Sequence, residues 1–309
     1  MYSNFAFDDA TEQECSLPGW VQEYRQVSTG HYRGTTVAIE LPRLTILRER
    51  INVKTEQVFS APKGQLVFYY YYDSGSTAND LVSGRANSTN VGFAWDWSDR
   101  VGFMHAGSDL LMVVLDPQLL GVTKLRSGSL HGDARIQAAH AAEWLVSVLH
   151  VLADEEGFRH LRDQLQAILP ELIHDRLSFL YENCELESDA GMAKSEEIYR
   201  RLRDRLYGTP DEALTVSALS RELSVTPAVL RKLCTEFTGV QLDNLLVKLR
   251  LNGARRSLIG ARGQNCRVSD IAMDWGFMHW SRFAARYRTL FGECPSETLQ
   301  CATPHHLHV

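Results

Sequence analysis

Hydrogen-bond donors recur at helical spacing in the segment IAMDWGFMHWSRFAARYRTLFGECP, residues 271–295. At about 100° per residue, one face of a helix there would collect the apolar side chains of Phe283, Tyr287, Leu290 and Phe291. The opposite face and its flanks would carry Trp280, Ser281, Arg282, Ala285 and Arg288. Arginine can bond a guanine edge through two N–H groups, and serine can bond phosphates or base edges. Small side chains also let a helix approach closely, so this face suits insertion into the major groove of DNA.

A weaker copy of this pattern lies earlier in the chain. VSALSRELSVTPAVLRKLCTEFTG begins at Val216 and VSDIAMDWGFMHWSRFAARYRTLFG begins at Val268, and both have the form helix, short turn, helix. In the first copy the apolar face holds Leu230, Leu233, Cys234 and Phe237, and the outward face holds Ala228, Arg231, Lys232 and Thr235. A single such face is most often only solvated, but two in matching contexts favour a pair of DNA-reading helices.

Turn and cap residues indicate how these helices are positioned. Thr226 is a good N-cap, Pro227 is a good first helical residue, and Gly276 supplies the turn of the second copy. Between the copies, LDNLLVKLRLNGARRSLI (242–259) predicts one long helix, with Leu245, Leu249 and Leu258 as candidate core positions. Such a rigid spacer would hold the two reading helices at the fixed separation that successive visits to the major groove require.

Charge and composition limit the class of protein. The 309 residues carry a net charge of −6, but residues 209–309 hold 12 Lys and Arg against 9 Asp and Glu. The rest of the chain therefore holds 20 basic and 29 acidic side chains, so a more basic module is attached to an acidic one. Six scattered cysteines without a C-x-x-C pair indicate neither a disulfide framework nor a zinc knuckle. No apolar run approaches the roughly 20 residues that span a bilayer, and the acidic start lacks a secretory signal, so we expect a cytoplasmic protein without a membrane partner.

Periodicity divides the N-terminal part into strands and then helices. From His31 to about Asp116, the runs TTVAIEL, RLTILRERINV, GQLVFYYYY, VGFAWDW and LLMVVL predict an antiparallel barrel or sandwich. From about Gly132 the spacing predicts two or three amphipathic helices, broken near Pro170. The apolar stripe of Trp144, Leu145, Val148 and Leu152 exceeds what one side of a small barrel needs, so we expect part of it to form a homodimer interface. Residues 185–197 lack apolar periodicity and read as an interdomain linker.

The strand region also offers candidate ligand-binding residues. A barrel interior could hold a small-molecule effector and could be lined from Phe68, Tyr70, Tyr72, Trp95 and Trp97. Aromatic residues in a β-domain more often form plain core, and alternation lets only half of the rings in FYYYY point inward.

Catalytic and metal chemistry have weak support. His31 and His105 would suit a cupin-like metal site, but the sequence has no clustered His-x-His with a following Glu, so structural histidines are favoured. There is no nucleophile elbow, P-loop or Gly-rich dinucleotide signature. We therefore expect no enzyme activity, no metal and no other cofactor.

The paired motifs, the LRLNGARRSLI spacer and the ending IAMDWGFMHWSRFAARYRTLFGECPSETL resemble the C-terminal DNA-binding domain of AraC/XylS-type transcription regulators. The resemblance covers about the last hundred residues and implies that two recognition helices enter adjacent major-groove segments. With the strand pattern, it predicts an α+β chain: a cupin-like N-terminal β-barrel or sandwich with helices, followed by an all-α domain with two helix-turn-helix motifs. The implied DNA contacts are Ala228, Arg231, Lys232, Thr235, His279, Trp280, Ser281, Arg282, Ala285 and Arg288.

These expectations combine into one domain plan. An effector-sensing and dimerisation domain is expected at 1–184, a linker at 185–197 and the DNA-binding domain at 198–309. Within the last, the motifs are expected at about 216–237 and 268–290, with the linker helix between them at about 242–259.

The predicted function is a ligand-responsive activator of a catabolic or metabolic operon, which binds operator DNA as a homodimer and contacts RNA polymerase. HYRGTTVAIELPRLTILRE is similar to the corresponding stretch of ethanolamine-operon regulators, which makes a small amine, with or without a cobalamin, one candidate signal. Two alternatives stay open: an effector-independent DNA-binding regulator, and a cupin-like metal-dependent enzyme fused to a DNA-binding domain.

Overall fold

The computed structural model describes residues 2–17, 19–72, 90–98, 100–122, 124–153, 159–186, 194–208, 214–300 and 307–308. Nine strands of five or more residues form its N-terminal part: β1 (Tyr2–Phe7), β2 (Val21–Gln26), β3 (Gly34–Leu41), β4 (Leu44–Ile51), β5 (Thr55–Ser60), β6 (Leu66–Tyr72), β7 (Val91–Trp95), β8 (Arg100–Met104) and β9 (Ser108–Leu115). Shorter elements are the helix α1 (Ala10–Gln13), the 3-10 helix η1 (Pro117–Leu120) and the two-residue strands β10 (Gly128–Ser129), β11 (Glu185–Leu186) and β12 (Leu307–His308).

The strands form two antiparallel sheets. The larger has the order β11-β10-β7-β6-β9-β4-β3-β1-β12, and the smaller has the order β2-β5-β8. Among the described strands the hydrogen-bonded ladder does not close into a ring, so the expected cupin-like barrel is replaced by two sheets that face each other across a shared apolar core. The mixed α+β class, with a sheet-rich N-terminal region and a helical C-terminal region, is confirmed.

All five predicted β-rich runs are strands, whereas four further strands of five or more residues were not foreseen. The confirmed runs are β3, β4, β6, β7 and β9, which together build the centre of the larger sheet. The missed strands β1, β2, β5 and β8 lie at the edge of that sheet or in the smaller one. Sequences such as VQEYRQ in β2 and TEQVFS in β5 are too polar for the alternation rule, and Gln26 and Glu56 are nevertheless buried.

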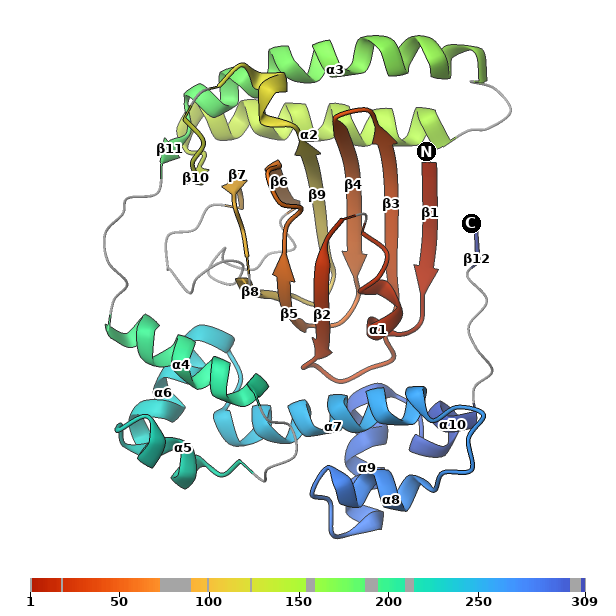
Figure 1. Cartoon of the computed structure of the whole chain (residues 1–309), viewed down its shortest axis with the longest axis vertical. Helices are drawn as coiled ribbons and strands as arrows, with labels where there is room; N and C mark the ends of the chain where they lie inside the picture. The colour runs from red at the N-terminus through yellow and green to blue at the C-terminus, as the bar shows by residue number, and fades with distance from the viewer. Residues whose placement is uncertain are drawn as a thin grey trace.

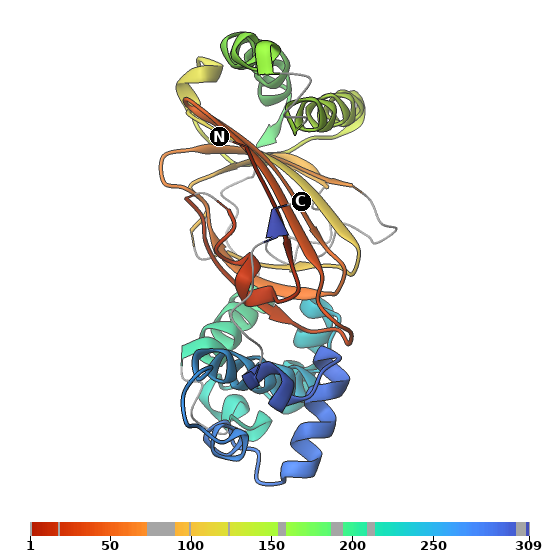
Figure 2. The same cartoon turned by 90° about the vertical axis from the view of Figure 1, so that its right-hand side faces the viewer.

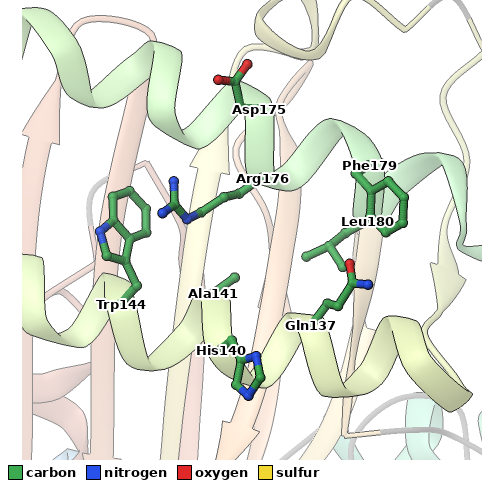
Figure 3. Close-up of a pocket in the computed structure, with 8 residues that line it drawn as sticks. All are labelled: Gln137, His140, Ala141, Trp144, Asp175, Arg176, Phe179 and Leu180. Carbon is green, nitrogen blue, oxygen red and sulfur yellow. The ribbon is translucent and has the colours of Figure 1, made fainter.

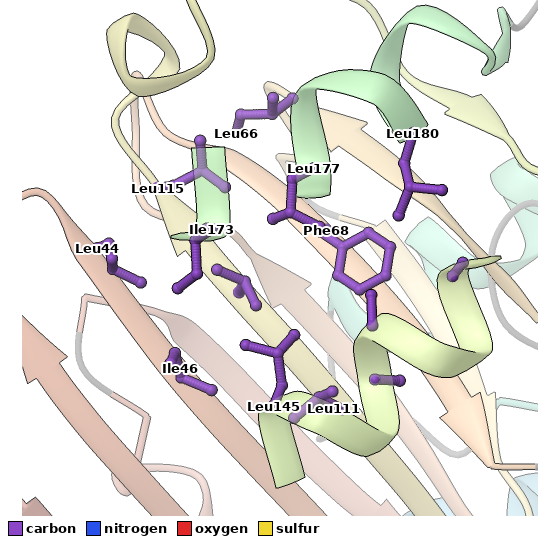
Figure 4. Packing of buried hydrophobic residues seen from close by; sticks show 14 of the residues in the cluster. Leu44, Ile46, Leu66, Phe68, Leu111, Leu115, Leu145, Ile173, Leu177 and Leu180 are labelled. Carbon is purple, nitrogen blue, oxygen red and sulfur yellow. The ribbon is translucent and has the colours of Figure 1, made fainter. Parts of the chain in front are cut away.

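The other face of the larger sheet is covered by α2 (Gly132–Ala153) and α3 (Arg159–Glu182), as Figure 1 and Figure 4 show. Leu145 and Leu152 of α2 are buried in this core, so the apolar stripe predicted for a homodimer interface faces the sheet instead. Trp144 and Val148 of the same stripe also pack against this core. The predicted break at Pro170 is wrong, because α3 continues through it.

Packing explains why α3 survives the proline. A proline removes one helical N–H bond and crowds the preceding turn. Leu169 and Ile173, on either side of Pro170, are both buried against the sheet. Tertiary contacts on this face therefore override the local preference for a break.

The helical part consists of α4 (Lys194–Gly208), α5 (Val216–Glu222), α6 (Pro227–Thr238), α7 (Leu242–Gly260), α8 (Val268–Asp274), α9 (Trp280–Phe291) and α10 (Pro295–Gln300). Two separate apolar cores organise these helices, and α7 contributes to both. We call α4, α5, α6 and the first half of α7 the first lobe, and the second half of α7 with α8, α9 and α10 the second lobe. In Figure 1 α7 runs along the sheet-rich part with α8 on its far side, and Figure 2 shows the helical part lying at one end of the sheets.

Local sequence fixes the ends of the two helices that carry the outward cations. Thr226 caps α6 by accepting a hydrogen bond from the Val229 N–H at 3.3 Å, and Pro227 is its first residue, as predicted. Gly239 and Gly292 follow α6 and α9 with φ of +66° and +79°, the left-handed conformation that glycine adopts at helix ends.

Candidate functional site

The outward face of α6 is exposed along its length. Ala228, Arg231, Lys232 and Thr235 are all exposed, whereas Leu230, Leu233 and Cys234 are buried, so the predicted division is confirmed for these residues. The side chain of Phe237, the fourth member of the predicted apolar face, lies outside the part that the structure describes. Cys234 lies inside the first lobe, where burial raises the pKa of its thiol to about 11. The thiol therefore stays neutral near pH 7, as expected of a buried cysteine that serves in packing.

The cations of α6 are partly engaged by neighbouring acids. Arg231 Nε donates to Asp243 Oδ2 at 2.8 Å, across the turn between α6 and α7. The hydrogen bond from Arg231 holds the pKa of the Asp243 carboxyl below its ordinary value. Lys232 lies 3.6 Å from Glu236 one turn along the helix. Both pairs are solvent-exposed and therefore weak, so a phosphate or a base edge can replace these carboxylates.

The outward face of α9 is more strongly cationic. His279, Trp280, Ser281, Arg282, Ala285 and Arg288 are exposed, and Phe283, Tyr287, Leu290 and Phe291 are buried, as predicted. Within the described part of the chain, no carboxylate lies within 4.0 Å of Arg282, Arg286 or Arg288. Arg286 is exposed and lies one helical turn from Arg282, but it was absent from the predicted contacts. The i, i+4 spacing of the two arginines was the signal that could have identified it.

Trp280 has a mixed environment. Its ring centroid lies 5.9 Å from that of Phe283, yet 48% of the residue is exposed. Together with the exposed Met278 just before α9, it forms an apolar border to the arginine face. Such a border can contact thymine methyl groups or sugars.

The helix α7 connects the two outward faces. It is a single helix of 19 residues, about 28 Å long at 1.5 Å per residue. Leu245 and Leu258 are buried in the first and second lobes respectively, and Leu249 is partly buried. Trp275 packs directly on Gly253 of α7, where an added Cβ would come within 2.1 Å of its ring. The second lobe is therefore seated closely on the spacer helix.

The predicted ligand-binding aromatics do not converge on one interior. Phe68, Tyr70, Tyr72 and Trp95 lie on the face of the larger sheet that α2 and α3 cover, and only Trp97 lies between the sheets. The expectation of a single interior lined by all five is therefore wrong. Both faces of the larger sheet are buried, so the alternation in FYYYY could not indicate which face borders a cavity.

A small cavity does lie between the two sheets. Trp20, Phe59, Tyr69, Tyr71 and Trp97 surround most of it, and its volume of about 30 Å³ suits about one water molecule. The indole N–H groups of Trp20 and Trp97 are buried, and in the described residues neither has a hydrogen-bond acceptor. Two unpaired donors beside an aromatic wall call for an acceptor that the described residues do not supply.

Glu49 forms a polar wall of the same cavity. Its carboxylate accepts hydrogen bonds from Tyr24 Oη at 2.5 Å and from Gln13 Nε2 at 3.0 Å. Burial raises the pKa of the Glu49 carboxyl to about 7, although both hydrogen bonds favour the charged form. The cavity therefore contains a carboxyl that changes charge near neutral pH.

We expect Glu49→Gln to change the pH dependence of stability. In the unfolded chain this carboxyl titrates near 4.5, so between about pH 4.5 and 7 the folded state holds a proton that the unfolded state has released. The stability that Glu49 contributes is present below pH 4.5 and lost as the pH rises through 7. Relative to the parent, the free energy of unfolding of Glu49→Gln should rise by about 1–3 kcal/mol from pH 5 to pH 8 in urea titrations. Glu182→Gln, at an exposed position, is the control, and parallel curves for parent and Glu49→Gln would contradict the expectation.

A wider groove lies on the outer surface between α2 and α3 (Figure 3). It has a volume of about 380 Å³ and is open to solvent. The Arg176 guanidinium lies 4.2 Å from the centre of the Trp144 ring, and Phe179 is 46% exposed at the other end. This groove is distinct from the predicted aromatic set and contains none of its residues.

The two histidines considered as metal ligands lie apart from any ligand cluster. His31 precedes β3 and lies near the end of α9, where its backbone is close to Gly292, and His105 lies in the turn between β8 and β9. Across the described residues there is no group of three or more His, Cys, Asp or Glu side chains arranged to hold a metal ion.

Comparisons with known proteins address the helical part most directly. Residues 219–300 match a family model described as a helix-turn-helix domain. A XylDLEGF operon transcriptional activator of Pseudomonas putida is 33% identical over 172 residues, which cover 54% of this chain and 53% of that protein. A probable thc operon regulatory protein of Rhodococcus erythropolis is 33% identical over 103 residues, 33% of this chain and 31% of its own. The chain thus spans about half or less of the length of these two relatives.

Two solved structures show partial likeness. The AraC-like transcriptional activator CuxR aligns over 88% of this chain and 100% of its own, at 12% identity and a TM-score of 0.35. The C-terminal domain of AraT, a response regulator from Geobacillus stearothermophilus, aligns over 38% of this chain and 98% of its own, at 22% identity and a TM-score of 0.32.

Proposed function

We propose that this chain is a sequence-specific DNA-binding regulator of transcription of the AraC/XylS type, because residues 219–300 match a helix-turn-helix family model. The observation that carries this proposal is the pair of exposed cationic faces on α6 and α9, held at the two ends of α7. In this proposal α5 with α6 and α8 with α9 form two helix-turn-helix units. The second helix of each enters the major groove, in segments about 10 bp apart on one side of the duplex.

The two helices would contribute unequally. Arg282, Arg286 and Arg288 of α9 face solvent without a carboxylate nearby, whereas Arg231 of α6 must first leave Asp243. Exchange of an exposed carboxylate for a phosphate or a guanine edge is a small free-energy change. Because Asp243 and Glu236 already neutralise part of the charge of α6, we expect α9 to supply more of the sequence-independent attraction, and α6 to bind with a weaker dependence on salt.

We expect Arg231→Ala and Arg282→Ala each to weaken specific binding by about 1–3 kcal/mol, because each removes a side chain that can bond a base edge. Duplexes enriched from a random library by the parent chain supply the site, and titrations at one fixed salt concentration compare this site with a scrambled one. Footprints should show each variant losing preference in a different segment, with the two segments about 10 bp apart.

The control for these variants is Arg135→Ala, at an exposed position on α2 in the other half of the chain. Circular dichroism and melting confirm that each variant is folded. If folded Arg231→Ala and Arg282→Ala proteins both kept the parent affinity and preference, the outward faces would not be the reading surfaces.

We further propose that the sheet-rich half senses a small molecule between its two sheets. The support is the cavity with two unpaired indole donors, an aromatic wall and the buried Glu49 carboxyl. A ligand with an aromatic or apolar body and a hydrogen-bond acceptor would satisfy Trp20 and Trp97, and the sheets would have to part to admit it. Small amines and aromatic acids are the first compounds to screen by thermal shift, since binding to the native state alone raises the melting temperature. A Trp97→Phe variant should lose the shift, and a library that shifts neither protein would favour an effector-independent regulator.

The remaining parts of the proposal concern assembly and location. The matched relatives are regulatory proteins, and we propose that this chain acts on DNA in the cytoplasm without catalytic activity and contacts RNA polymerase as an activator. Ile136 and Phe179 are exposed apolar side chains on α2 and α3, which supports a homodimer through this surface. Sedimentation at tens of micromolar tests the dimer. No helix within the described residues is long and apolar enough to span a membrane.

A further inference from the structure

The C-terminal ends of α6 and α9 are both bound by the sheet-rich half of the chain. Lys54 Nζ donates to the carbonyl oxygen of Thr238, the last residue of α6, at 2.9 Å. At the end of α9, the carbonyl oxygen of Leu290 accepts from the Gly30 N–H at 3.1 Å and from Gln26 Nε2 at 2.7 Å. The last carbonyls of a helix have no partner within the helix, so these contacts satisfy groups that water would otherwise bind.

The two lobes that contain α6 and α9 have separate cores. The apolar cluster of the first lobe and that of the second lobe share no residue. Within the helical part, α7 supplies side chains to both: Leu242 and Leu245 to the first, and Leu251 and Leu258 to the second. A single helix is an imperfect spacer, because long helices bend and side chains at its two ends repack independently.

The segment from Gln26 to Gly30 touches both lobes and the helix between them. Val27, which is 1% exposed, lies in the core of the first lobe, and its carbonyl oxygen accepts from Lys248 Nζ. The backbone N–H and carbonyl of Gln26 both bond the Asn252 side chain at 2.9 Å, at the middle of α7. The side chain of Gln26 also donates to the carbonyl oxygen of Leu290 in the second lobe. One short segment of the sheet-rich half therefore contacts both lobes and spans the joint beside α7.

We propose that Lys54 and Gln26 are positioning residues that brace α6 against α9 and so set the spacing of the DNA segments that the chain accepts. This inference rests on the proposed DNA-binding function. Adding one base pair between the two segments shifts the second by about 3.4 Å and rotates it by about 35° around the duplex. A braced pair of helices cannot follow that displacement, whereas a pair joined only by α7 can.

The test uses the full chain and duplexes selected by it, with one or two base pairs inserted or removed between the two protected segments. The parent should lose about 10-fold or more in affinity for each displaced duplex, comparable to the loss of a good base contact. In the double variant Lys54→Met with Gln26→Met, the loss of affinity for displaced duplexes should fall to less than about 3-fold. A single mismatched base pair in the site should lower the affinity of this variant as much as it lowers that of the parent. If the double variant folds poorly, Lys54→Met alone is measured in its place. This variant retains the buried hydrogen bonds of Gln26, so its loss of affinity for displaced duplexes should be smaller than that of the parent but larger than about 3-fold. Lys63→Met, at an exposed turn of the sheet-rich half, is the matched control and should keep the parent penalty.

A second measurement does not depend on DNA. Spin labels on keto-bearing amino acids at exposed positions 236 in α6 and 289 in α9 report the distance between the two helices. The distribution should be narrow in the parent and in Lys63→Met, and broader in the Lys54 and Gln26 variants. An unchanged penalty together with an unchanged distribution would overturn the brace and leave the proposed function intact. If the parent enriched no sequence from the library, the proposed function would fail and this inference with it.

Discussion

Replacement of Phe283 by alanine is expected to lower the free energy of unfolding by about 3–5 kcal/mol, the usual loss when a buried aromatic ring is truncated. Phe283 is fully buried at the centre of the second lobe. Its ring centroid lies 4.9 Å from that of Phe277 and 5.6 Å from that of Tyr287. Urea titration of the full chain measures the loss, and binding to selected and scrambled duplexes should fall alike because α9 loses its support.

Trp280→Ala is the control for this prediction. It removes a larger ring from the same helix, but one that is about half exposed and that contacts Phe283 from one side. The loss of stability should therefore be clearly smaller than for Phe283→Ala, whereas any loss of DNA affinity should appear in a protein that is still folded. Equal losses of stability for the two variants would show that the second lobe is not centred on Phe283.

Arg255→Met should destabilise the chain by a similar amount, about 3–5 kcal/mol, because it leaves the buried Asp9 carboxylate without its cation. Arg255 of α7 is 8% exposed and lies 2.6 Å from Asp9, which is 4% exposed and belongs to the sheet-rich half. Its Nη1 also lies 2.7 Å from Glu293 of the second lobe. Burial alone would lower the pKa of the guanidinium, but Asp9, Tyr287 and Glu293 more than offset it and hold the pKa above its ordinary value.

The double variant Asp9→Asn with Arg255→Met separates two contributions to the loss of stability. One is the loss of the attraction between Arg255 and Asp9, and the other is the cost of leaving the Asp9 carboxylate buried without a cation. Asparagine keeps the N-cap of α1, where Asp9 accepts from the Thr11 N–H at 2.7 Å, but it carries no charge. We expect the double variant to recover part of the stability that Arg255→Met loses, as measured by urea titration. A double variant less stable than Arg255→Met would mean that Asp9 is not destabilised by the loss of its partner.

Local patterns in the sequence were sufficient to predict the helices α6 and α9 and the spacer α7. The buried and exposed faces of α6 and α9, the Thr226 cap and the single long helix α7 all agree with the predictions. Each depends on residues within a few turns of one another, so side-chain periodicity and cap chemistry determine it. The same holds for the five β-rich runs that became the centre of the larger sheet.

Local patterns could not predict what covers each face of the larger sheet. Tyr70 and Tyr71 are adjacent and face opposite sides of β6, one toward α2 and α3 and the other toward the smaller sheet. Alternation fixes that they diverge, but not which side borders a cavity, because both faces are buried. The helices α2 and α3 likewise show an apolar stripe without indicating whether a sheet or a second copy covers it.

Periodicity and cap residues thus identify the short-range units of this chain: two outward cationic helices, the spacer between them and a strand-rich half. How the two halves meet depends on long-range contacts, because Gln26, Lys54 and Asp9 bind groups about 180 to 265 residues away along the chain. These are polar contacts made by isolated side chains, which leave no periodic trace in the sequence. Their partners are backbone carbonyls or single charged groups that become neighbours only after each half has folded and the two have docked on α7.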